Sequence, residues 1–367
     1  MTNRTYAIIG AGNGGQAIAA FISSLGNTVK IYDPFEKSLE AITKNGGIQL
    51  EGIYDSFNKI ELASTNIEAV LKDAEIVMVV NPSTYHKAIA EKCAPYLTEN
   101  QIVFLHPGGT FGAFAFKKAL EDGGCHYDIS VAESNTLIYA CRLVESGLAH
   151  VNGKKDRILV ATLPAKDNDR VCSILREVYE EITPSKNVLV TSFDNTNPIF
   201  HPAPTLLSTS WVESEKDFLY YYEGISDSIG NFIIEMDKER INVGLALGLE
   251  YGTDIIDAFE QYVVEYNSTG ETITDVVRKV SAYDGINGPT SLKTRYLYED
   301  IPMGLVAISS LAKQLNIKTE RIDLIISLGE KMLNEDFRID SRNAKNLGLE
   351  GMTSEQIMNF AITGEKC

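Results

Sequence analysis

Short β-rich runs alternate with helical patterns over the first half of this 367-residue chain, and the alternation stops near residue 190. Runs such as TYAIIG, TVKIYD, EIVMVV and QIVFLH are separated by segments such as FGAFAFKKALED, which have apolar residues at spacings of three and four. Because parallel strands need helical crossovers, this order predicts a parallel sheet with helices on both faces. We expect the last strand at NVLVTSF, residues 187–193, and a small antiparallel ribbon at GGIQLEGIYDSFNKIEL.

The second half of the chain shows only helical patterns. In SDSIGNFIIEMDKERINVGLALGL, the apolar residues Ile229, Phe232, Ile233, Met236 and Ile241 fall on one helical face. TDIIDAFEQYVVEY, MGLVAISSLAKQL and RIDLIISLGEKML have the same period, which predicts an all-α domain. A chain of this length is expected to form two domains, and we place them at residues 1–188 and 189–367.

A glycine loop directly follows the first β-rich run, in YAIIGAGNGGQAIAAFI. Gly10, Gly12 and Gly15 have the GxGxxG spacing between a strand and a helix that is typical of a dinucleotide-binding Rossmann domain. The spacing predicts a tight turn, a close approach of the backbone to a pyrophosphate, and a helix start that favours negative charge. With the loop residues Asn13 and Gly14 included, the fold prediction is an α/β Rossmann domain with a doubly wound parallel sheet, plus an all-α C-terminal domain.

Two further strand ends are expected to border the dinucleotide. Asp33 ends the second strand about 20 residues past the loop, where a carboxylate accepts hydrogen bonds from the adenosine ribose. The same carboxylate repels a ribose phosphate, and Pro34 occupies a position where an arginine would bind one. We therefore expect NAD(H) to be favoured, with NADP(H) as the alternative. Asn81 and Pro82 follow the EIVMVV strand and are expected at the cofactor because ligands collect at the carboxyl ends of such strands.

The charge and cysteine content exclude several classes of partner. The formal net charge is −17, and the sequence has no run of Lys or Arg, so we expect neither nucleic acid nor an anionic membrane surface as a partner. Anionic substrates must then meet locally placed cations. The five cysteines are widely spaced and include no CxxC pair, so the sequence predicts reduced thiols in the cytoplasm, without a disulfide framework or a metal site.

Among the five histidines, His201 is the strongest candidate for chemistry. Three others lie in a helical pattern, beside a glycine turn and in a polar stretch, which favours surface or packing roles: His86, His126 and His150. His106 ends a strand and is open to a cofactor contact or a structural role. His201 lies in NPIFHPAP, where the expected domains meet, and Pro198 and Pro202 restrict the backbone around it. Taken alone, a structural histidine is an equally good interpretation of this position.

A catalytic histidine needs a partner, usually a carboxylate, that fixes its tautomer and stabilises its charged form. The segment TSLKTRYLYEDIPMGLV supplies Arg295 and Asp300 in a polar cluster before an apolar helix. Asp300 beside His201 would favour the imidazolium, and Arg295 could bind a substrate carboxylate bidentately. From the spacing alone, a solvated charge cluster at a helix start is an equally good interpretation.

Taken together, these stretches resemble the opine dehydrogenases. The resemblance is carried by DNTNPIFHPAPTLL and TRYLYEDIPMGLV, and extends to HPGGTFGA, AESNTLIYACR and MDKERINVGLALGL, so it covers nearly the whole chain. It implies an NAD(P)H-dependent oxidoreductase that acts on CH–NH bonds and condenses a pyruvate-like α-keto acid with the amino group of an amino acid through an imine.

The resemblance also implies particular site residues. His201 matches the catalytic histidine of the family, Asp300 its paired acid and Arg295 the arginine of the same cluster. Thr136 corresponds to a substrate-binding position and Cys141 to a cofactor-binding position. No stretch identifies a pocket for the amino-acid side chain. The oligomeric state stays open, with a homodimer as one option.

Two alternatives use the same Rossmann domain. A ketopantoate reductase or a polyol-phosphate dehydrogenase would rely on a lysine, for which Lys154 and Lys155 are candidates, although a charged turn before a strand of the first domain explains them more simply. A non-catalytic sensor of NAD(H) would keep the glycine loop but would not need His201, Arg295 and Asp300 together.

Overall fold

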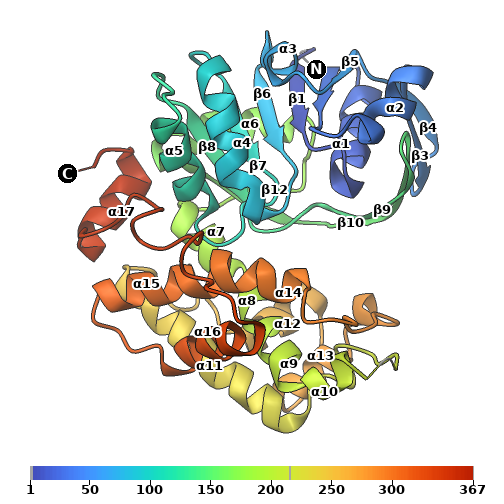
Figure 1. Cartoon of the computed structure of the whole chain (residues 1–367). Coiled ribbons are helices and arrows are strands. Elements are labelled where there is room, and N and C mark those ends of the chain that lie inside the picture. The colour runs from blue at the N-terminus through green and yellow to red at the C-terminus, as the bar shows by residue number, and fades with distance from the viewer. Residues whose placement is uncertain (1–2, 215, 367) are drawn as a thin grey trace. The chain divides into compact units, whose positions relative to one another are not determined.

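A computed structural model describes residues 3–214 and 216–366, which divide into two compact units (Figure 1). Unit 1 comprises the described residues of Met1–Ser192 and Asn359–Cys367, and unit 2 comprises those of Phe193–Met358. The division falls four residues after the boundary expected at 188/189, and the C-terminal segment belongs with unit 1 rather than with the helical unit.

Unit 1 is built on an eight-stranded sheet in the order β12-β11-β8-β7-β6-β1-β2-β5. Its strands are β1 (Thr5–Ile9), β2 (Thr28–Tyr32), β5 (Leu62–Ser64), β6 (Ile76–Val79), β7 (Ile102–Leu105), β8 (Ser130–Ser134), β11 (Ile158–Leu163) and β12 (Ile182–Pro184). The strands from β8 to β5 run parallel, which confirms the doubly wound Rossmann sheet. β11 pairs antiparallel with β8, so this one strand pair departs from the parallel arrangement of the rest of the sheet. The reason is that a hairpin, and no crossover helix, connects β8 to β11.

That hairpin belongs to a second sheet, in the order β4-β3-β10-β9, which covers helix α1 (Asn13–Ser24) (Figure 1). Its strands are β3 (Gly47–Gly52), β4 (Ser56–Lys59), β9 (Tyr139–Glu145) and β10 (Leu148–Lys154). The expected antiparallel ribbon is confirmed as β3 and β4. The other two strands of this sheet, β9 and β10, were not predicted. Ile18 and Ile22 of α1 share one core cluster with Leu50 and Val151 of this sheet. The glycine loop is therefore followed by a helix that is buried on almost all sides.

The other helices of unit 1 connect the strands. They are α2 (Glu36–Asn45), α3 (Ile67–Leu71), α4 (His86–Cys93), α5 (Gly112–Asp122) and α6 (Asn168–Arg176), with 3₁₀ turns η1 (Ser83–Tyr85), η2 (Ala94–Tyr96) and η3 (Ala165–Asp167). Two helices span the division between the units: α7 (Val188–Asp194) and α17 (Ser354–Thr363).

The strand expected at residues 187–193 was wrong, because this run forms α7. Asn187 Oδ1 accepts hydrogen bonds from the N–H groups of Leu189 at 2.9 Å and Val190 at 3.4 Å, as an N-terminal cap does. Val188, Leu189 and Phe193 are fully buried. A short apolar run that is buried all round has no periodicity to distinguish strand from helix.

Unit 2 is helical, which confirms the all-α prediction, and its described residues contain no strand beyond two isolated bridges. Its helices are α8 (Asn197–Phe200), α9 (Pro202–Leu207), α10 (Thr209–Val212), α11 (Asp227–Ala246), α12 (Ala258–Tyr266), α13 (Ile273–Arg278), α14 (Arg295–Tyr298), α15 (Val306–Gln314) and α16 (Glu320–Leu333), with the 3₁₀ turn η4 (Ser281–Tyr283) and the π-helical turn η5 (Ile301–Leu305). Of the five α11 residues expected on one face, Ile233, Met236 and Ile241 are buried.

A buried ion pair holds α11 to its neighbours. Arg240 Nε donates to Asp237 Oδ1 at 2.6 Å, and both side chains are 1% exposed. Arg240 also donates to the carbonyl oxygens of Phe193 and Ile256, while Asp237 Oδ2 accepts from Ala258 N at 2.7 Å. The pair therefore ties α11 to the end of α7 and to the start of α12.

We predict that Arg240→Met destabilises the protein by about 3–5 kcal/mol, because it leaves the Asp237 carboxylate buried without its cation. Urea unfolding followed by circular dichroism measures the change. The control is Lys238→Met, which breaks the exposed Glu235–Lys238 pair at the same i,i+3 spacing on the same helix and should cost about 0–1 kcal/mol. Equal effects of the two substitutions would contradict a structural role for the buried pair.

Candidate active site

The glycine loop joins β1 to α1 and leaves open space above its backbone. Gly10 has φ +111°, a conformation that L-residues with side chains rarely adopt. A Cβ on Gly15 would lie 1.8 Å from the Gly10 carbonyl oxygen, so this glycine is required by close helix packing. A Cβ on Gly12 would meet nothing within 4 Å. The packing of the protein itself therefore does not require a glycine at position 12, whereas a bound pyrophosphate would.

Asp33 is 8% exposed and holds the loop in place. Its Oδ2 accepts from Ala11 N at 2.9 Å, and its Oδ1 accepts from Phe35 N at 3.0 Å. Each carboxylate oxygen can accept a further hydrogen bond, so Asp33 is able to bind ribose hydroxyls while it fixes the backbone.

Asn81 follows β6 and lies against the loop, because a Cβ on Gly10 would be 2.8 Å from Asn81 Oδ1. This oxygen is buried, and within residues 3–214 and 216–366 no hydrogen bond reaches it. An orphaned acceptor costs about 1–3 kcal/mol, which a donor on a ligand would recover. Pro82 follows as the N-cap of η1. The open space at Gly12, the lone pairs of Asp33 and the Asn81 acceptor together fit a dinucleotide.

The remaining loop residues face the protein. Asn13 Oδ1 accepts from Leu143 N at 3.1 Å, which ties the start of α1 to β9. Gly14 lies under Val80 and Leu137, where a Cβ would come within 3.0–3.4 Å of their side chains. Both residues position the loop, and their contact with a cofactor stays a prediction.

His106 is fully buried, and both of its ring nitrogens are bonded to the protein. Ser134 Oγ donates to the Thr136 carbonyl at 2.9 Å, so it accepts from His106 Nδ1 at 2.7 Å, and Ile138 N donates to His106 Nε2 at 3.2 Å. These bonds define a neutral imidazole. Burial, with a smaller effect of Lys155, lowers the pKa of His106 to about 3. These hydrogen bonds fit a structural role for His106, because they hold residues 134–138 in place.

Thr136 and Cys141 lie on or beside this segment. Thr136 Oγ1 accepts from Lys155 Nζ at 3.0 Å. Cys141 is in β9, and burial raises the pKa of its thiol to about 11, so the sulfur is not a thiolate near neutral pH. Lys154 forms an ion pair with Glu181, which supports the structural interpretation of this lysine.

In unit 2, His201 and Asp300 form a hydrogen-bonded pair. His201 lies between α8 and α9, and Asp300 immediately precedes η5. The distance from His201 Nδ1 to Asp300 Oδ2 is 2.7 Å, with the two side chains 12% and 14% exposed. The carboxylate fixes the tautomer with hydrogen on Nδ1, which leaves Nε2 for exchange of a proton with a substrate.

A close backbone contact explains how residues 99 positions apart meet. A Cβ on Gly304 would lie 2.2 Å from Pro198 Cγ, so only glycine lets η5 approach α8 this closely. Pro198 lies in the first turn of α8, and Pro202 begins α9 on the other side of His201. The prolines and Gly304 thus determine where the imidazole meets the carboxylate.

Tyrosines that sequence reasoning missed surround the imidazole. The Tyr296 ring stacks on His201 with centroids 4.1 Å apart at 18°, and the Tyr221 hydroxyl lies 3.3 Å from His201 Nε2. Tyr220 donates to the His201 carbonyl at 2.7 Å. The signals were a tyrosine run at residues 220–222 and Tyr296 next to Arg295, but a tyrosine pattern alone does not distinguish a site from a core.

Burial raises the pKa of Asp300 above its usual value, and the charge of His201 and its hydrogen bond oppose this shift. A desolvated carboxylate next to an imidazole gains most when the ring is positive, so Asp300 stabilises charge that develops on His201 during proton transfer.

Arg295 begins α14, and its guanidinium is 73% exposed. Its Nε and Nη2 contact Glu299 Oε2 at 2.7 Å and 2.6 Å. A guanidinium carries five N–H groups, so it can hold this carboxylate and still donate to another.

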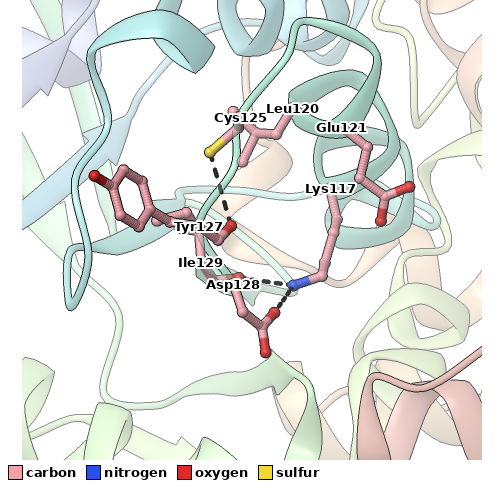
Figure 2. Close-up of a pocket in the computed structure, with 7 residues that line it drawn as sticks. All are labelled: Lys117, Leu120, Glu121, Cys125, Tyr127, Asp128 and Ile129. Carbon is pink, nitrogen blue, oxygen red and sulfur yellow. Dashed lines mark hydrogen bonds and ion pairs between the residues drawn. The ribbon is translucent and has the colours of Figure 1, made fainter.

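A hollow in unit 1 is lined by none of the predicted site residues (Figure 2). It lies between α5 and the residues just before β8, where Lys117 Nζ donates to Asp128 Oδ1 at 2.6 Å and to the Ile129 carbonyl at 3.0 Å. It therefore borders the amino end of β8, whereas ligands of doubly wound sheets bind at the carboxyl ends.

Within the described part of the chain, no three or more His, Cys, Asp or Glu side chains lie together as metal ligands would. In the same residues, no helix combines the length and apolar character that a membrane span needs.

Comparisons with known proteins agree with this architecture. Residues 184–333 match the family described as NAD/NADP octopine/nopaline dehydrogenase, alpha-helical domain, and residues 5–125 match the NAD-dependent glycerol-3-phosphate dehydrogenase N-terminus. The chain is 34% identical over 356 residues to the opine dehydrogenase of Arthrobacter sp. (strain 1C). The matched region covers 97% of this chain and 98% of that protein.

Solved structures share the fold. A structure of octopine dehydrogenase in complex with NADH and agmatine superposes with a TM-score of 0.83 at 18% identity, covering 100% of this chain and 99% of the other. A ketopantoate reductase from Ralstonia eutropha JMP134 gives a TM-score of 0.63 at 14% identity, covering 90% and 99%.

The fold and the site define an NAD(P)-dependent oxidoreductase that acts on CH–NH donors. The chain belongs to the opine dehydrogenase family, as its sequence predicted, and the enzyme condenses an α-keto acid reductively with the amino group of an amino acid.

We predict that His106 makes the stability of unit 1 depend on pH. Its pKa in the folded state, about 3, lies below the unfolded value of about 6.5, so its contribution is fully present above pH 6.5 and is lost as the pH falls toward 3. Between pH 6.5 and 5.5 the loss should be about 1 kcal/mol, because the histidine of the unfolded chain is already half protonated at pH 6.5. The free energy of unfolding of His106→Gln should change less over this interval, while His150→Gln, at a half-exposed histidine, should match the unmodified protein. Identical pH dependence in all three proteins would contradict the prediction.

Proposed function

We propose that this enzyme condenses a pyruvate-like α-keto acid with an amino acid, that it favours NADH over NADPH, and that His201 and Asp300 act as its acid–base pair. The observation that carries the proposal is the 2.7 Å hydrogen bond between His201 Nδ1 and Asp300 Oδ2, which leaves Nε2 beside the Tyr221 hydroxyl. A histidine held in this way can pass a proton at Nε2 without changing its tautomer.

The reaction needs a proton at two points. The amino group of the amino acid adds to the keto carbon, and the carbonyl oxygen leaves as water after His201 Nε2 protonates it. The product of this step is an imine. NADH held at the glycine loop would supply the hydride that reduces the imine at carbon. The other proton is the one that the ammonium group of the amino acid must lose before its nitrogen attacks the keto carbon. The neutral His201 ring can accept this proton at Nε2 and so becomes the imidazolium that protonates the departing oxygen.

Arg295 is proposed to bind a substrate carboxylate. Its N–H groups that do not contact Glu299 can form two parallel hydrogen bonds to a carboxylate. Both substrates carry this group, and the net charge of −17 makes a local cation necessary. In unit 1, Thr136 is proposed to contact the substrate and Cys141 the cofactor. The widely spaced cysteines support a cytoplasmic location.

The preference for NADH rests on Asp33. Its carboxylate would lie next to the ribose 2′-phosphate of NADPH, and the two negative charges would repel each other. Because Asp33 also binds the N–H groups of Ala11 and Phe35, it cannot turn away without releasing the loop.

We predict that Asp33→Ser with Pro34→Arg reverses the cofactor preference, since the repulsion is removed and a phosphate partner is added. Fluorescence titration with each reduced cofactor measures the two Kd values. The unmodified enzyme should bind NADH about tenfold or more tightly than NADPH, and the double variant should bind NADPH more tightly. NADH binding should also weaken in the variant because the Ala11 contact is lost. An unmodified enzyme that prefers NADPH would contradict this assignment.

We also predict that His201→Gln and Asp300→Asn each lower kcat by about a hundredfold or more, the scale of acid–base contributions. The double variant should be little worse than the worse single variant, because the two groups act as one unit. The Kd for NADH should stay unchanged, since the glycine loop is in unit 1.

The control for this pair is His126→Gln, at an exposed histidine, which should leave kcat unchanged. Fully additive losses in the double variant, or near-normal turnover in His201→Gln, would return His201 to a structural role.

A further inference from the structure

The Tyr221 hydroxyl contacts the ring nitrogen of His201 that does not face Asp300. His201 Nδ1 donates to Asp300 Oδ2 at 2.7 Å, so in the neutral ring Nε2 is an acceptor. The Tyr221 oxygen lies 3.3 Å from Nε2, and the hydroxyl is therefore the donor in this contact. When the ring is an imidazolium, Nε2 carries hydrogen and Tyr221 becomes the acceptor. The direction of one hydroxyl thus follows the charge of His201.

The Tyr221 hydroxyl also has a partner besides the imidazole. The Tyr296 ring stacks on His201 with centroids 4.1 Å apart. Burial raises the pKa of Tyr296, with a smaller effect of Asp300, and a hydrogen bond from Tyr221 opposes this shift. A hydroxyl with partners on two sides can take up a proton from one side while it releases its own to the other.

The neighbouring tyrosine holds this geometry. The Tyr220 hydroxyl donates to the His201 carbonyl at 2.7 Å and accepts from Thr205 Oγ1 at 3.0 Å. Tyr221 packs edge-on against the Tyr220 ring, with centroids 5.1 Å apart at 87°. It also stacks on Tyr283, with centroids 3.8 Å apart at 13°. A buried ring packed on two sides keeps its hydroxyl at Nε2, as a group that acts in a reaction requires.

The proposed reaction takes a proton from one atom and delivers a proton to another. The ammonium group of the amino acid loses a proton before its nitrogen attacks, and the oxygen of the keto carbon gains one before it leaves as water. In the neutral ring, Nε2 already accepts the Tyr221 hydrogen, so an ammonium proton reaches Nε2 most directly through this hydroxyl. His201 and Tyr221 line the same hollow of unit 2, where a substrate nitrogen can contact the tyrosine oxygen.

We propose that Tyr221 is a catalytic residue that relays a proton from the substrate ammonium group to His201. The N–H bond of the ammonium breaks as a new O–H bond forms on Tyr221, and the former hydroxyl hydrogen moves to Nε2. The step yields an amine, a neutral phenol and an imidazolium, so no proton is gained or lost. Burial raises the pKa of the Tyr221 phenol, so this residue releases its hydrogen only as it receives another. The inference rests on the proposed acid–base function of His201.

The test removes one oxygen atom and keeps the ring. Tyr221→Phe should lower kcat about tenfold or more, because Nε2 then has to take the proton without the relay. The Kd for NADH, measured by fluorescence titration, should stay unchanged, since the glycine loop is in unit 1. Tyr251→Phe is the matched control. It removes an exposed hydroxyl of unit 2 that donates to Asp257, and it should turn over as the unmodified enzyme does.

Hydrogen isotope effects separate a relay from a structural role. In mixtures of H2O and D2O, the single-turnover rate of NADH oxidation by the unmodified enzyme should depend quadratically on the deuterium fraction, since two hydrogens move in one step. Tyr221→Phe should give a linear dependence, because one hydrogen moves. A tyrosine that only orients the ring would leave the form of the dependence unchanged. The same form in both proteins would therefore overturn the relay.

His201→Gln distinguishes a failure of the relay from a failure of the proposed function. Near-normal turnover of Tyr221→Phe beside a loss of about a hundredfold in His201→Gln would overturn the relay and leave the acid–base function intact. Near-normal turnover of His201→Gln would overturn the acid–base function itself, and the relay with it. A large loss in both, with the double variant little worse than His201→Gln alone, is the result that the relay predicts.

Discussion

The contact between His201 and Asp300 depends on one backbone constraint, the packing of the Pro198 ring onto Gly304. Both partners of the hydrogen bond lie within three to four residues of this contact, so a larger residue at position 304 would separate them. The contact stabilises the Asp300 carboxylate electrostatically, because burial disfavours its charged form and the imidazole beside it offsets that cost. A carboxylate kept out of water in this way responds strongly to charge on His201, which is the property that proton transfer needs.

The buried pair Asp237–Arg240 supports the same segment from the other side. Arg240 binds the carbonyl of Phe193, and Gln261 binds the carbonyl of Asp194, so the chain leading to His201 is anchored before α8 begins. Asp237 binds the first N–H of α12, the helix that carries Gln261 and Glu265. One desolvated ion pair thus sets the positions of both the histidine segment and the start of α12. Specificity of this kind is the best physical reason to keep an ion pair that apolar residues could replace.

The sequence was sufficient for the fold class and for the residues whose chemistry is tied to a local pattern. The glycine spacing defined the Rossmann unit, and the proline-flanked His201 and the acidic Asp300 were found without knowledge of their distance. The prediction for residues 187–193 was wrong because a fully buried run has no period that distinguishes a strand from a helix. The β9–β10 hairpin was missed because it joins its sheet through β10 and β3, which are far apart in the sequence. The tyrosines around His201 were missed for a related reason, since they come from residues 220 to 296 and only the tertiary structure brings them together.

The acidic charge of the protein gives these local arrangements their importance. At physiological ionic strength the Debye length is about 8 Å, so most of the net charge of −17 is screened from a bound substrate, and only the nearest groups determine which ions bind. Arg295 is held beside Glu299 and presents its remaining donors to solvent. A substrate carboxylate that reaches these donors would meet a cation at contact distance, well within the Debye length. One guanidinium at the site can therefore bind a carboxylate even though the protein as a whole is acidic.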